Sequence, residues 1–271
     1  MHPMAFGVAV YPLSVALGVV GALAISICSV GTRLKRAEIW WCIGALLLID
    51  ASSLLGAKLH AMLEAGSWEI VSRFGFRYPG GIIGALVGGG LLAWFGRRGK
   101  LLLRLGDLIA PSASFAMVFV RLGCLLAGCC HGTPSDLPWA VAFTQDSYAW
   151  RWHVDHALLS PDSPVSLAVH PLQLYFAAWS AFTGVIAWRM LRSSLPAGQV
   201  LFAYVGFDNF GKALLESFRD PPVPALRWAS LLLTALAMIA LARNAGFAPV
   251  GAAPRPATGD RHQLNAEPSP Y

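Results

Sequence analysis

Apolar stretches about the length of a membrane span recur seven times along this chain. They cover residues 8–30, 39–57, 78–96, 105–128, 171–188, 198–217 and 224–241. A helix needs about 20 mainly apolar residues to cross a bilayer. Only 13% of the 271 residues are charged, whereas a soluble domain carries about a quarter. These features argue against a soluble enzyme, a nucleic-acid-binding protein and a disordered scaffold. They predict an all-α polytopic membrane protein with seven transmembrane helices.

The positions of the basic residues predict the orientation of these helices. No Lys or Arg precedes the first stretch, and Arg33, Lys35 and Arg36 follow it. This order is the reverse of a cleavable signal peptide, so we expect a retained helix. Alternating the sides from there places most other basic residues of the connections on the same side of the membrane. Because Lys and Arg concentrate on the cytoplasmic side, the sequence predicts the N-terminus outside and the C-terminus inside.

Residues 1–243 are expected to form one transmembrane domain. Its largest hydrophilic excursion, at about residues 129–169, is predicted to lie outside the membrane. The excursion contains Trp139, Trp150 and Trp152, which are typical of a segment that rests on the membrane interface. Residues 244–271 are rich in Pro and Ala and are predicted to form a disordered cytoplasmic tail.

Charged residues inside the apolar stretches are the first candidates for a functional site. Each costs on the order of 2.5–3.5 kcal/mol at mid-bilayer, so each needs a reason to be there. In the sixth stretch and just beyond it, Asp208, Lys212, Glu216 and Arg219 follow one another at spacings that place them on one helical face. At a rise of about 1.5 Å per residue, Lys212 and Arg121 of the fourth stretch both lie in the outer half of the membrane.

Two interpretations of these charges remain open. Lys212 and Glu216 can form an intrahelical pair while Arg121 and Arg219 extend to the interface. Alternatively, the cations bind an anion. Nine residues separate Arg121 from the next polar stretch, so a phospholipid phosphate is the simplest partner for it.

Two further segments lie near the outer ends of their predicted helices. Pro171 suits a first helical position, which places His170 at the helix end and Gln173 and Tyr175 in the first turn. His170 can cap this helix or take part in catalysis. Gly80 and Gly81 can either bring two helices close together or present backbone N–H groups to an anion.

Cys129, Cys130 and His131 raise the question of a metal site. Adjacent cysteines lack the two-residue spacer of a zinc knuckle, and the sequence contains no second cluster that would complete four ligands. We therefore expect no metal and no other cofactor, and we assign His131 to the interface as a donor.

Several of these segments together resemble the prolipoprotein diacylglyceryl transferase family. The stretch from Arg121 to Gly132, RLGCLLAGCCHG, resembles the family's signature region, and residues 170–175, HPLQLY, resemble its HPTQLYE pattern. Residues 78–84 are similar to its GGLIG element, and residues 212–219 to its RFxxExxR element. The matches keep the family's order up to about residue 243.

This resemblance implies an enzyme of the bacterial cytoplasmic (inner) membrane. Such an enzyme transfers the diacylglyceryl group of phosphatidylglycerol to the lipobox cysteine thiol of a prolipoprotein and releases glycerol phosphate. It implies a phosphate-binding role for Arg121 and functional roles for Glu216 and Arg219. The expected catalytic residues are Arg121, His170, Lys212, Glu216 and Arg219. The expected substrate-binding residues are Arg121, Gly80, Gly81, Gln173, Tyr175 and Gly132.

The chemistry needs cations for the departing phosphate and a base that deprotonates the thiol. His170 and His131 are both candidate bases, and the sequence does not choose between them.

The sequence departs from the family pattern at four positions. Lys212 replaces a functionally important arginine and keeps the charge without the bidentate geometry. Pro79 stands in place of His or Tyr, Phe176 in place of Glu, and Cys124 in place of an asparagine that many members carry. The alternatives are a divergent lipid-binding paralogue without catalysis, a transferase with another acceptor, and a transporter. A transporter would place its polar groups at the midplane of two related halves.

Overall fold

Helices make up most of the molecule in the computed structural model, which describes residues 4–5, 8–66, 78–96 and 98–246. The seven predicted stretches coincide with the seven long helices of this described part. These are α1 (Val10–Arg33), α2 (Arg36–Ala65), α3 (Tyr78–Gly96), α4 (Gly99–Ala127), α6 (Leu172–Met190), α7 (Gln199–Leu215) and α8 (Pro224–Gly246). A short helix α5 (Tyr148–Asp155), a 3-10 turn η1 (Glu216–Phe218) and two antiparallel two-residue strands, β1 (Met4–Ala5) and β2 (Val8–Ala9), complete it.

Five of the described helices are long and apolar enough to cross a membrane: α1, α2, α3, α4 and α8. The other two long helices carry more polar residues. Helix α6 buries Gln173, Ser180 and Thr183, and α7 has 17 residues and contains Asp208 and Lys212. Helices α6 and α7 pack against α4 and against each other, so neighbouring helices cover part of their polar faces. The prediction of a mainly helical protein with several spans is confirmed, and the count of seven spans stays a prediction.

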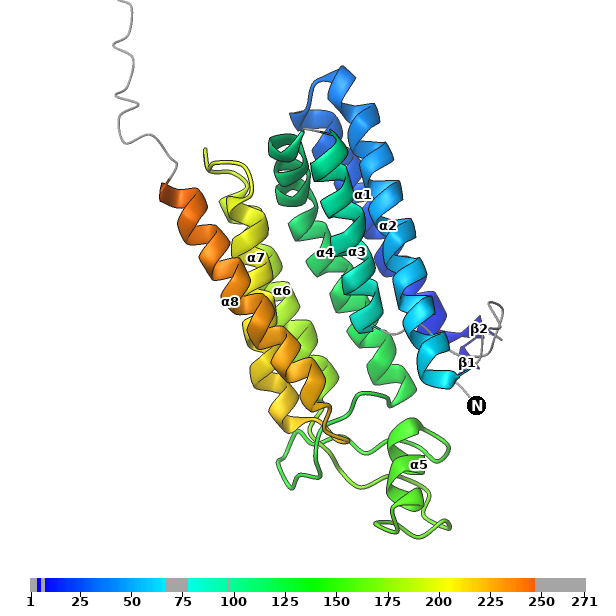
Figure 1. Ribbon diagram of the computed structural model, residues 1–271. Helices are drawn as coiled ribbons and strands as arrows, with labels where there is room; N and C mark the ends of the chain where they lie inside the picture. The colour runs from blue at the N-terminus through cyan, green and yellow to red at the C-terminus, as the bar shows by residue number, and fades with distance from the viewer. Residues whose placement is uncertain (1–3, 6–7, 67–77, 97, 247–271) are drawn as a thin grey trace, which may run out of the picture.

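The long helices form one bundle in which α4 is central (Figure 1). Helix α1 packs on α4, α2 on α3, α4 on α6, and α7 on both α6 and α8. The excursion with α5 lies at the end of the bundle where β1 and β2 lie (Figure 1). The connection between α1 and α2 and the end of α8 lie at the opposite end (Figure 1).

Several helices extend beyond the predicted apolar stretches, and α2 and α4 do so by the most residues. Helix α2 continues past Ala57 through the His60–Glu64 pair, whose side chains are 3.8 Å apart, and ends at Gly66 in the left-handed conformation. Helix α4 begins six residues earlier than expected, at Gly99, and includes Lys100 and Arg104. Good helix formers extend a helix beyond the apolar region, so hydropathy alone underestimates helix length.

Small and hydroxyl side chains bring the helices close together. A side chain added at Gly84 would collide with the backbone of Ser52 on α2, and one at Gly184 with Ser114 on α4. The Oγ atoms of Ser26 and Ser112 are 2.7 Å apart and join α1 to α4. This packing is typical of helix pairs in membranes, where small residues permit dispersion contacts and short interhelical hydrogen bonds.

The carboxylate of Asp107 fixes the start of α7 against α4. It accepts hydrogen bonds from the backbone N–H groups of Gly198 at 2.7 Å and Leu201 at 2.8 Å. The first N–H groups of a helix have no intrahelical partner, and a carboxylate also complements the helix dipole there. This contact sets the position of α7, the helix that carries Lys212, relative to α4, which carries Arg121.

The excursion folds onto itself rather than only resting on a surface. Residue pairs Pro134–Val169, Val141–Val169 and Thr144–Val165 form antiparallel bridges, and α5 packs beside them. Trp150, one of the three tryptophans of this segment, is buried, and its indole N–H donates to the carbonyl of Ser163 at 2.8 Å. Trp139 is 56% exposed. Trp150 is thus buried in an excursion that has a small core of its own, and contact of this segment with the membrane interface stays a prediction. Residues 244–246, predicted to belong to the disordered tail, instead form the end of α8, where the Asn244 side chain donates to the carbonyl of Ala197 at 2.7 Å. The rest of the predicted tail, from residue 247 onward, lies outside the described residues.

Candidate active site

The end of α4 is a tight turn that places three cysteines together. Gly128 ends the helix with a φ of 66°, and the N–H of Cys129 donates back to the carbonyl of Cys124 at 3.1 Å. This is the arrangement in which a left-handed glycine closes a helix. Cys130 follows with a φ of 56°, which is uncommon for a residue other than glycine. The turn brings the next residues back over the end of α4.

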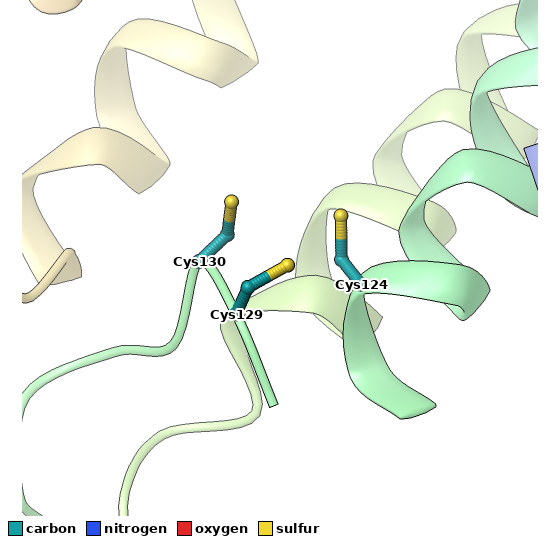
Figure 2. Close-up of side chains that lie close together, drawn as sticks. All are labelled: Cys124, Cys129 and Cys130. Carbon is teal, nitrogen blue, oxygen red and sulfur yellow. The ribbon is translucent and has the colours of Figure 1, made fainter. Parts of the chain in front are cut away.

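The sulfur atoms of Cys124, Cys129 and Cys130 all lie within 4.8 Å of one another (Figure 2). The Nη2 of Arg219 donates to the Sγ of Cys130 at 3.4 Å. Hydrogen bonds from the Cys124 and Cys129 thiols, followed by the positive charges of Arg219 and Arg121, lower the pKa of the Cys130 thiol well below its ordinary value. Cys130 was not among the predicted site residues, although its position nine residues after Arg121 was visible in the sequence.

Arg219 is held by the turn that follows α7. Its Nη1 lies 3.2 Å from the Oε1 of Glu216, and both side chains are largely buried, at 16% and 7% exposure. The backbone at Arg219 forms an antiparallel bridge with Gly132, and the N–H of Thr133 donates to the carbonyl of Phe218 at 2.8 Å. Two segments far apart in the sequence, the turns after α4 and α7, therefore meet at Arg219.

Arg121 lies one turn and a half before the end of α4, and it faces α6. Its guanidinium carbon is 4.2 Å from the centroid of the Phe176 ring. Within the described part of the chain, its buried Nε has no hydrogen-bond partner. A ring face attracts a cation but accepts no strong hydrogen bond. The guanidinium therefore retains donor capacity for an anion that is not part of the protein.

Lys212 has a different partner from the one considered in the sequence. Its Nζ forms an ion pair with the Oδ2 of Asp208 at 2.6 Å, and their side chains are 11% and 4% exposed. The possible Lys212–Glu216 pair is not the arrangement found, because Glu216 binds Arg219 instead. Helix α7 ends at Leu215, so Glu216 belongs to η1 and follows the turn toward Arg219.

The segment before α6 joins the turn after α4 through backbone and side-chain contacts. The N–H of Gly132 donates to the carbonyl of His170 at 3.0 Å, and the amide Nε2 of the fully buried Gln173 donates to the carbonyl of Cys129 at 2.7 Å. A side chain at Gly132 would collide with His170. Gln173 and Gly132, both predicted to bind substrate, thus hold the turn in position.

The His170 side chain is half-buried and faces aromatic neighbours. Its Nδ1 lies 3.3 Å from the hydroxyl of Tyr175, which also accepts a hydrogen bond from the Trp139 indole at 2.8 Å. Its ring centroid is 5.5 Å from that of Phe218, the residue before Arg219. Helix α6 begins at Leu172 with Pro171 at the cap position, and no side chain caps it. The structure therefore gives no support for His170 as the side-chain cap.

Gly80 lies in the contact between α2 and α3. A side chain there would collide with Gly56 and His60 of α2, whereas one at Gly81 would meet Ser53 at ordinary contact distance. Tight helix packing thus accounts for Gly80. An anion contact at Gly80 and Gly81 stays a prediction.

The bundle and its charged end define a multi-pass membrane protein with two partly buried guanidinium groups near a carboxylate and a thiol. The profile of the prolipoprotein diacylglyceryl transferase family matches residues 2–243. The chain therefore belongs to the prolipoprotein diacylglyceryl transferase family.

Among its relatives are proteins named phosphatidylglycerol–prolipoprotein diacylglyceryl transferase. The one from Clostridium tetani is 33% identical over 146 residues, which are 52% of each chain. One from Clostridium perfringens, whose name carries the number 2, is 26% identical over 66% of each chain. That from Treponema pallidum is 31% identical over 59% of this chain and 51% of its own. The chain thus spans between about half and two thirds of the length of the curated relatives it matches.

Proposed function

We propose that this protein transfers the diacylglyceryl group of phosphatidylglycerol to the lipobox cysteine thiol of a prolipoprotein. In this reaction the acceptor thiolate attacks the glyceryl carbon that bears the phosphate. A carbon–sulfur bond forms, the carbon–oxygen bond to the phosphate breaks, and glycerol phosphate leaves with the electron pair. The observation that carries the proposal is the Arg121 guanidinium, whose buried Nε has no hydrogen-bond partner among the described residues and which lies close to the charges of Arg219 and Glu216.

In this proposal the two guanidinium groups bind the phosphate. Arg121, which stacks on Phe176, supplies free donors, and Arg219 is oriented by Glu216. Negative charge grows on the phosphate as the carbon–oxygen bond breaks. Fixed cations in a water-poor site therefore stabilise the transition state more than the ground state. Lys212, neutralised by Asp208, contributes through the charge of the pair rather than as a free cation.

His170 is favoured over His131 as the base. His131 is 3% exposed, and its Nδ1 lies 3.1 Å from the carbonyl of Gly132 while its ring faces His153. His170 is half-buried and adjoins Phe218, next to Arg219. A general base has to reach the proton it removes, so the more accessible ring suits the role better. The Tyr175 hydroxyl, which is within hydrogen-bonding distance of the His170 ring, is proposed to orient that ring.

The membrane arrangement belongs to the same proposal. Seven spans, with the N-terminus outside and the C-terminus inside the bacterial cytoplasmic membrane, would place the excursion and Arg219 at the outer surface. The excursion and the α1–α2 connection lie at opposite ends of the bundle, which supports this orientation (Figure 1). Secreted prolipoproteins would then meet the site from outside.

The test supplies phosphatidylglycerol and a lipobox peptide to the purified protein and measures both peptide lipidation and glycerol phosphate. We expect activity that is lost in Arg121→Ala. Arg192→Ala is a matched control because the Arg192 guanidinium also stacks on an aromatic ring, 3.8 Å from the centroid of Trp188, after the far end of α6. Absence of both products from the wild-type protein would refute the proposal.

One observation favours a second candidate, lipid binding without catalysis. The ring of Phe176 packs against the Arg121 guanidinium at a position where the family pattern has a glutamate. Retained binding of phosphatidylglycerol, sensitive to Arg121→Ala but without release of glycerol phosphate, would identify this function.

A further inference from the structure

A second cluster of side chains lies beside the candidate active site and takes no part in it. The imidazoles of His131 and His153 and the carboxylate of Asp220 each offer a donor atom, and the three atoms lie within 4.8 Å of one another. The cluster joins three segments: the turn after α4, helix α5 and the segment after η1. The two rings are 5.5 Å apart between centroids.

His153 makes this cluster unlike an ordinary packed core. Its side chain is completely buried, yet within the described residues neither Nδ1 nor Nε2 has a hydrogen-bond partner. Buried polar atoms in native proteins are nearly always satisfied, so an exception calls for a partner that is not part of the chain. The neighbouring donors, His131 and Asp220, are both of types that bind metal ions.

His131 is already oriented as a ligand. Its Nδ1 lies 3.1 Å from the carbonyl of Gly132, so an Nδ1–H group donates there and leaves the Nε2 lone pair available. Metal-bound histidines commonly donate their other ring N–H in this way, which fixes the tautomer and the direction of the ring. Asp220 is placed by its own backbone N–H, which donates to the carbonyl of His131 at 3.1 Å.

We propose that His131, His153 and Asp220 bind one divalent transition-metal ion, for which Zn²⁺ is the best fit. Two imidazoles and one carboxylate are a common donor set for Zn²⁺ with a fourth position for water. Donors on one tetrahedral zinc ion lie roughly 3.3–3.5 Å apart, so a closure of at most about 1.5 Å brings these three onto one ion. His131 was considered as a ligand only together with Cys129 and Cys130, and no metal was expected, because His153 and Asp220 lie in two other segments of the chain.

The position of the ion explains what it would do. His131 directly follows Cys130, and Asp220 directly follows Arg219, and these two preceding residues are in contact at 3.4 Å. The ion would therefore fasten the two turns that present Cys130 and Arg219 and attach α5 to both. This role does not rest on diacylglyceryl transfer, since a lipid-binding protein would need the same support.

The first measurement is the metal content of the full chain. The protein is expressed with an affinity tag that contains no histidine, purified in detergent and analysed by elemental mass spectrometry. We expect about one Zn²⁺ per chain, or uptake of about one from added zinc after chelation. A ligand that binds only the folded state also raises the thermal unfolding temperature.

Variants then assign the ion to these residues. We expect His153→Ala and Asp220→Asn each to weaken zinc binding by at least about tenfold and to lose the zinc-dependent rise in unfolding temperature. Asp220→Asn changes a half-buried side chain with little change in shape, so it tests the site even if His153→Ala folds poorly. The matched control is His156→Ala, because His156 is exposed and lies directly after α5. It should bind zinc as the wild type does.

Three results would overturn the proposal. The wild-type chain takes up no zinc, or the Asp220→Asn variant binds zinc as tightly as the wild type, or the ion leaves with Cys129→Ser and Cys130→Ser and stays in both ligand variants. The last result would assign the ion to the thiol cluster. Zinc binding is measured independently of lipidation, so loss of transferase activity alone would neither support nor contradict the zinc site. Failure of the proposed function can therefore be distinguished from failure of the zinc proposal.

Discussion

At the scale of single residues, the candidate site depends on how each buried charge is compensated. Lys212 pairs with Asp208, Arg219 contacts Glu216 and Cys130, and Arg121 stacks on Phe176. The first two cations have anionic or polarisable partners within the protein. Arg121 faces a ring that cannot neutralise its charge, so it is the cation with most to gain from a bound phosphate.

Arg121→Ala should reduce lipidation of a lipobox peptide by about 100-fold or more, because removal of one preorganised donor to a developing anion costs that much in comparable sites. The reduction should appear chiefly in kcat/KM, measured with phosphatidylglycerol in detergent or vesicles. Arg192→Ala, the control at the far end of α6, should leave the rate unchanged. An Arg121→Ala variant as active as the wild type would rule out phosphate binding by this residue.

Substitutions at Lys212 separate the effect of its positive charge on activity from its effect on the stability of the fold. Lys212→Ala should destabilise the fold by about 3–5 kcal/mol, because it leaves Asp208 buried without its partner. Lys212→Arg should be tolerated and should raise activity, since it supplies the bidentate donor geometry that lysine lacks.

The double variant Asp208→Asn/Lys212→Met separates the two effects. Thermal unfolding of this variant should show that much of the stability lost in Lys212→Ala is recovered. Its activity should stay low, because the charged pair contributes to the phosphate-binding site. Full activity in this double variant would show that the pair is structural only.

At the scale of elements, the packing of α3 on α2 sets how closely these two helices approach. Gly80 and Gly84 on α3 meet Gly56 and Ser52 on α2, so no side chain fits between the backbones. In a lipid environment such close approach replaces the hydrophobic driving force that is missing between helices. The glycines of α3 therefore have a packing role that is independent of any ligand.

Gly84→Ala should destabilise the protein by about 1–3 kcal/mol, because the added methyl group collides with the Ser52 carbonyl. Gly89→Ala, on the same helix, is the matched control, since a side chain there meets no atom of the described structure within 4 Å. Thermal unfolding in one detergent compares the two variants. Equal unfolding temperatures would contradict the close helix contact.

At the scale of the whole molecule, the bundle places its two sets of connections at opposite ends. The excursion, with α5 and the turns after α4 and α7, forms one end (Figure 1). The helix ends and connections at the other end carry a run of basic residues: Arg33, Lys35, Arg36, Arg98, Lys100, Arg104, Arg189 and Arg192. Because basic residues collect on the cytoplasmic side, this asymmetry supports the proposed orientation of the site toward the outer leaflet.

Cysteine labelling tests this orientation. Thr32→Cys lies near the end of α1, and Ser163→Cys lies in the excursion. A membrane-impermeant thiol reagent added to intact cells should label Ser163→Cys above the background of the parent chain and leave Thr32→Cys unlabelled. After the membrane is opened, both should react. Equal labelling of the two positions in intact cells would refute the topology.

The sequence by itself determined where the long helices lie and which buried charges need an explanation. Apolar segments long enough to span a membrane form helices because a bilayer or an apolar protein interior contains no water to bind backbone N–H and C=O groups. These groups must then form hydrogen bonds with one another within the segment. This is a local rule, so α3 was predicted with its bounds and Arg121 was identified without any contact known. The family motifs, read in order along the chain, also required no tertiary information.

Only the tertiary structure decided which groups meet. Arg219 contacts Cys130, and His131 lies beside His153 and Asp220, because backbone hydrogen bonds join the turn after α4 to the turn after α7. Lys212 pairs with Asp208 rather than Glu216 because α7 ends at Leu215. Glu216 therefore lies in η1, where it contacts Arg219. Such contacts depend on loop closure and on competition between partners, and no periodicity within one segment contains that information.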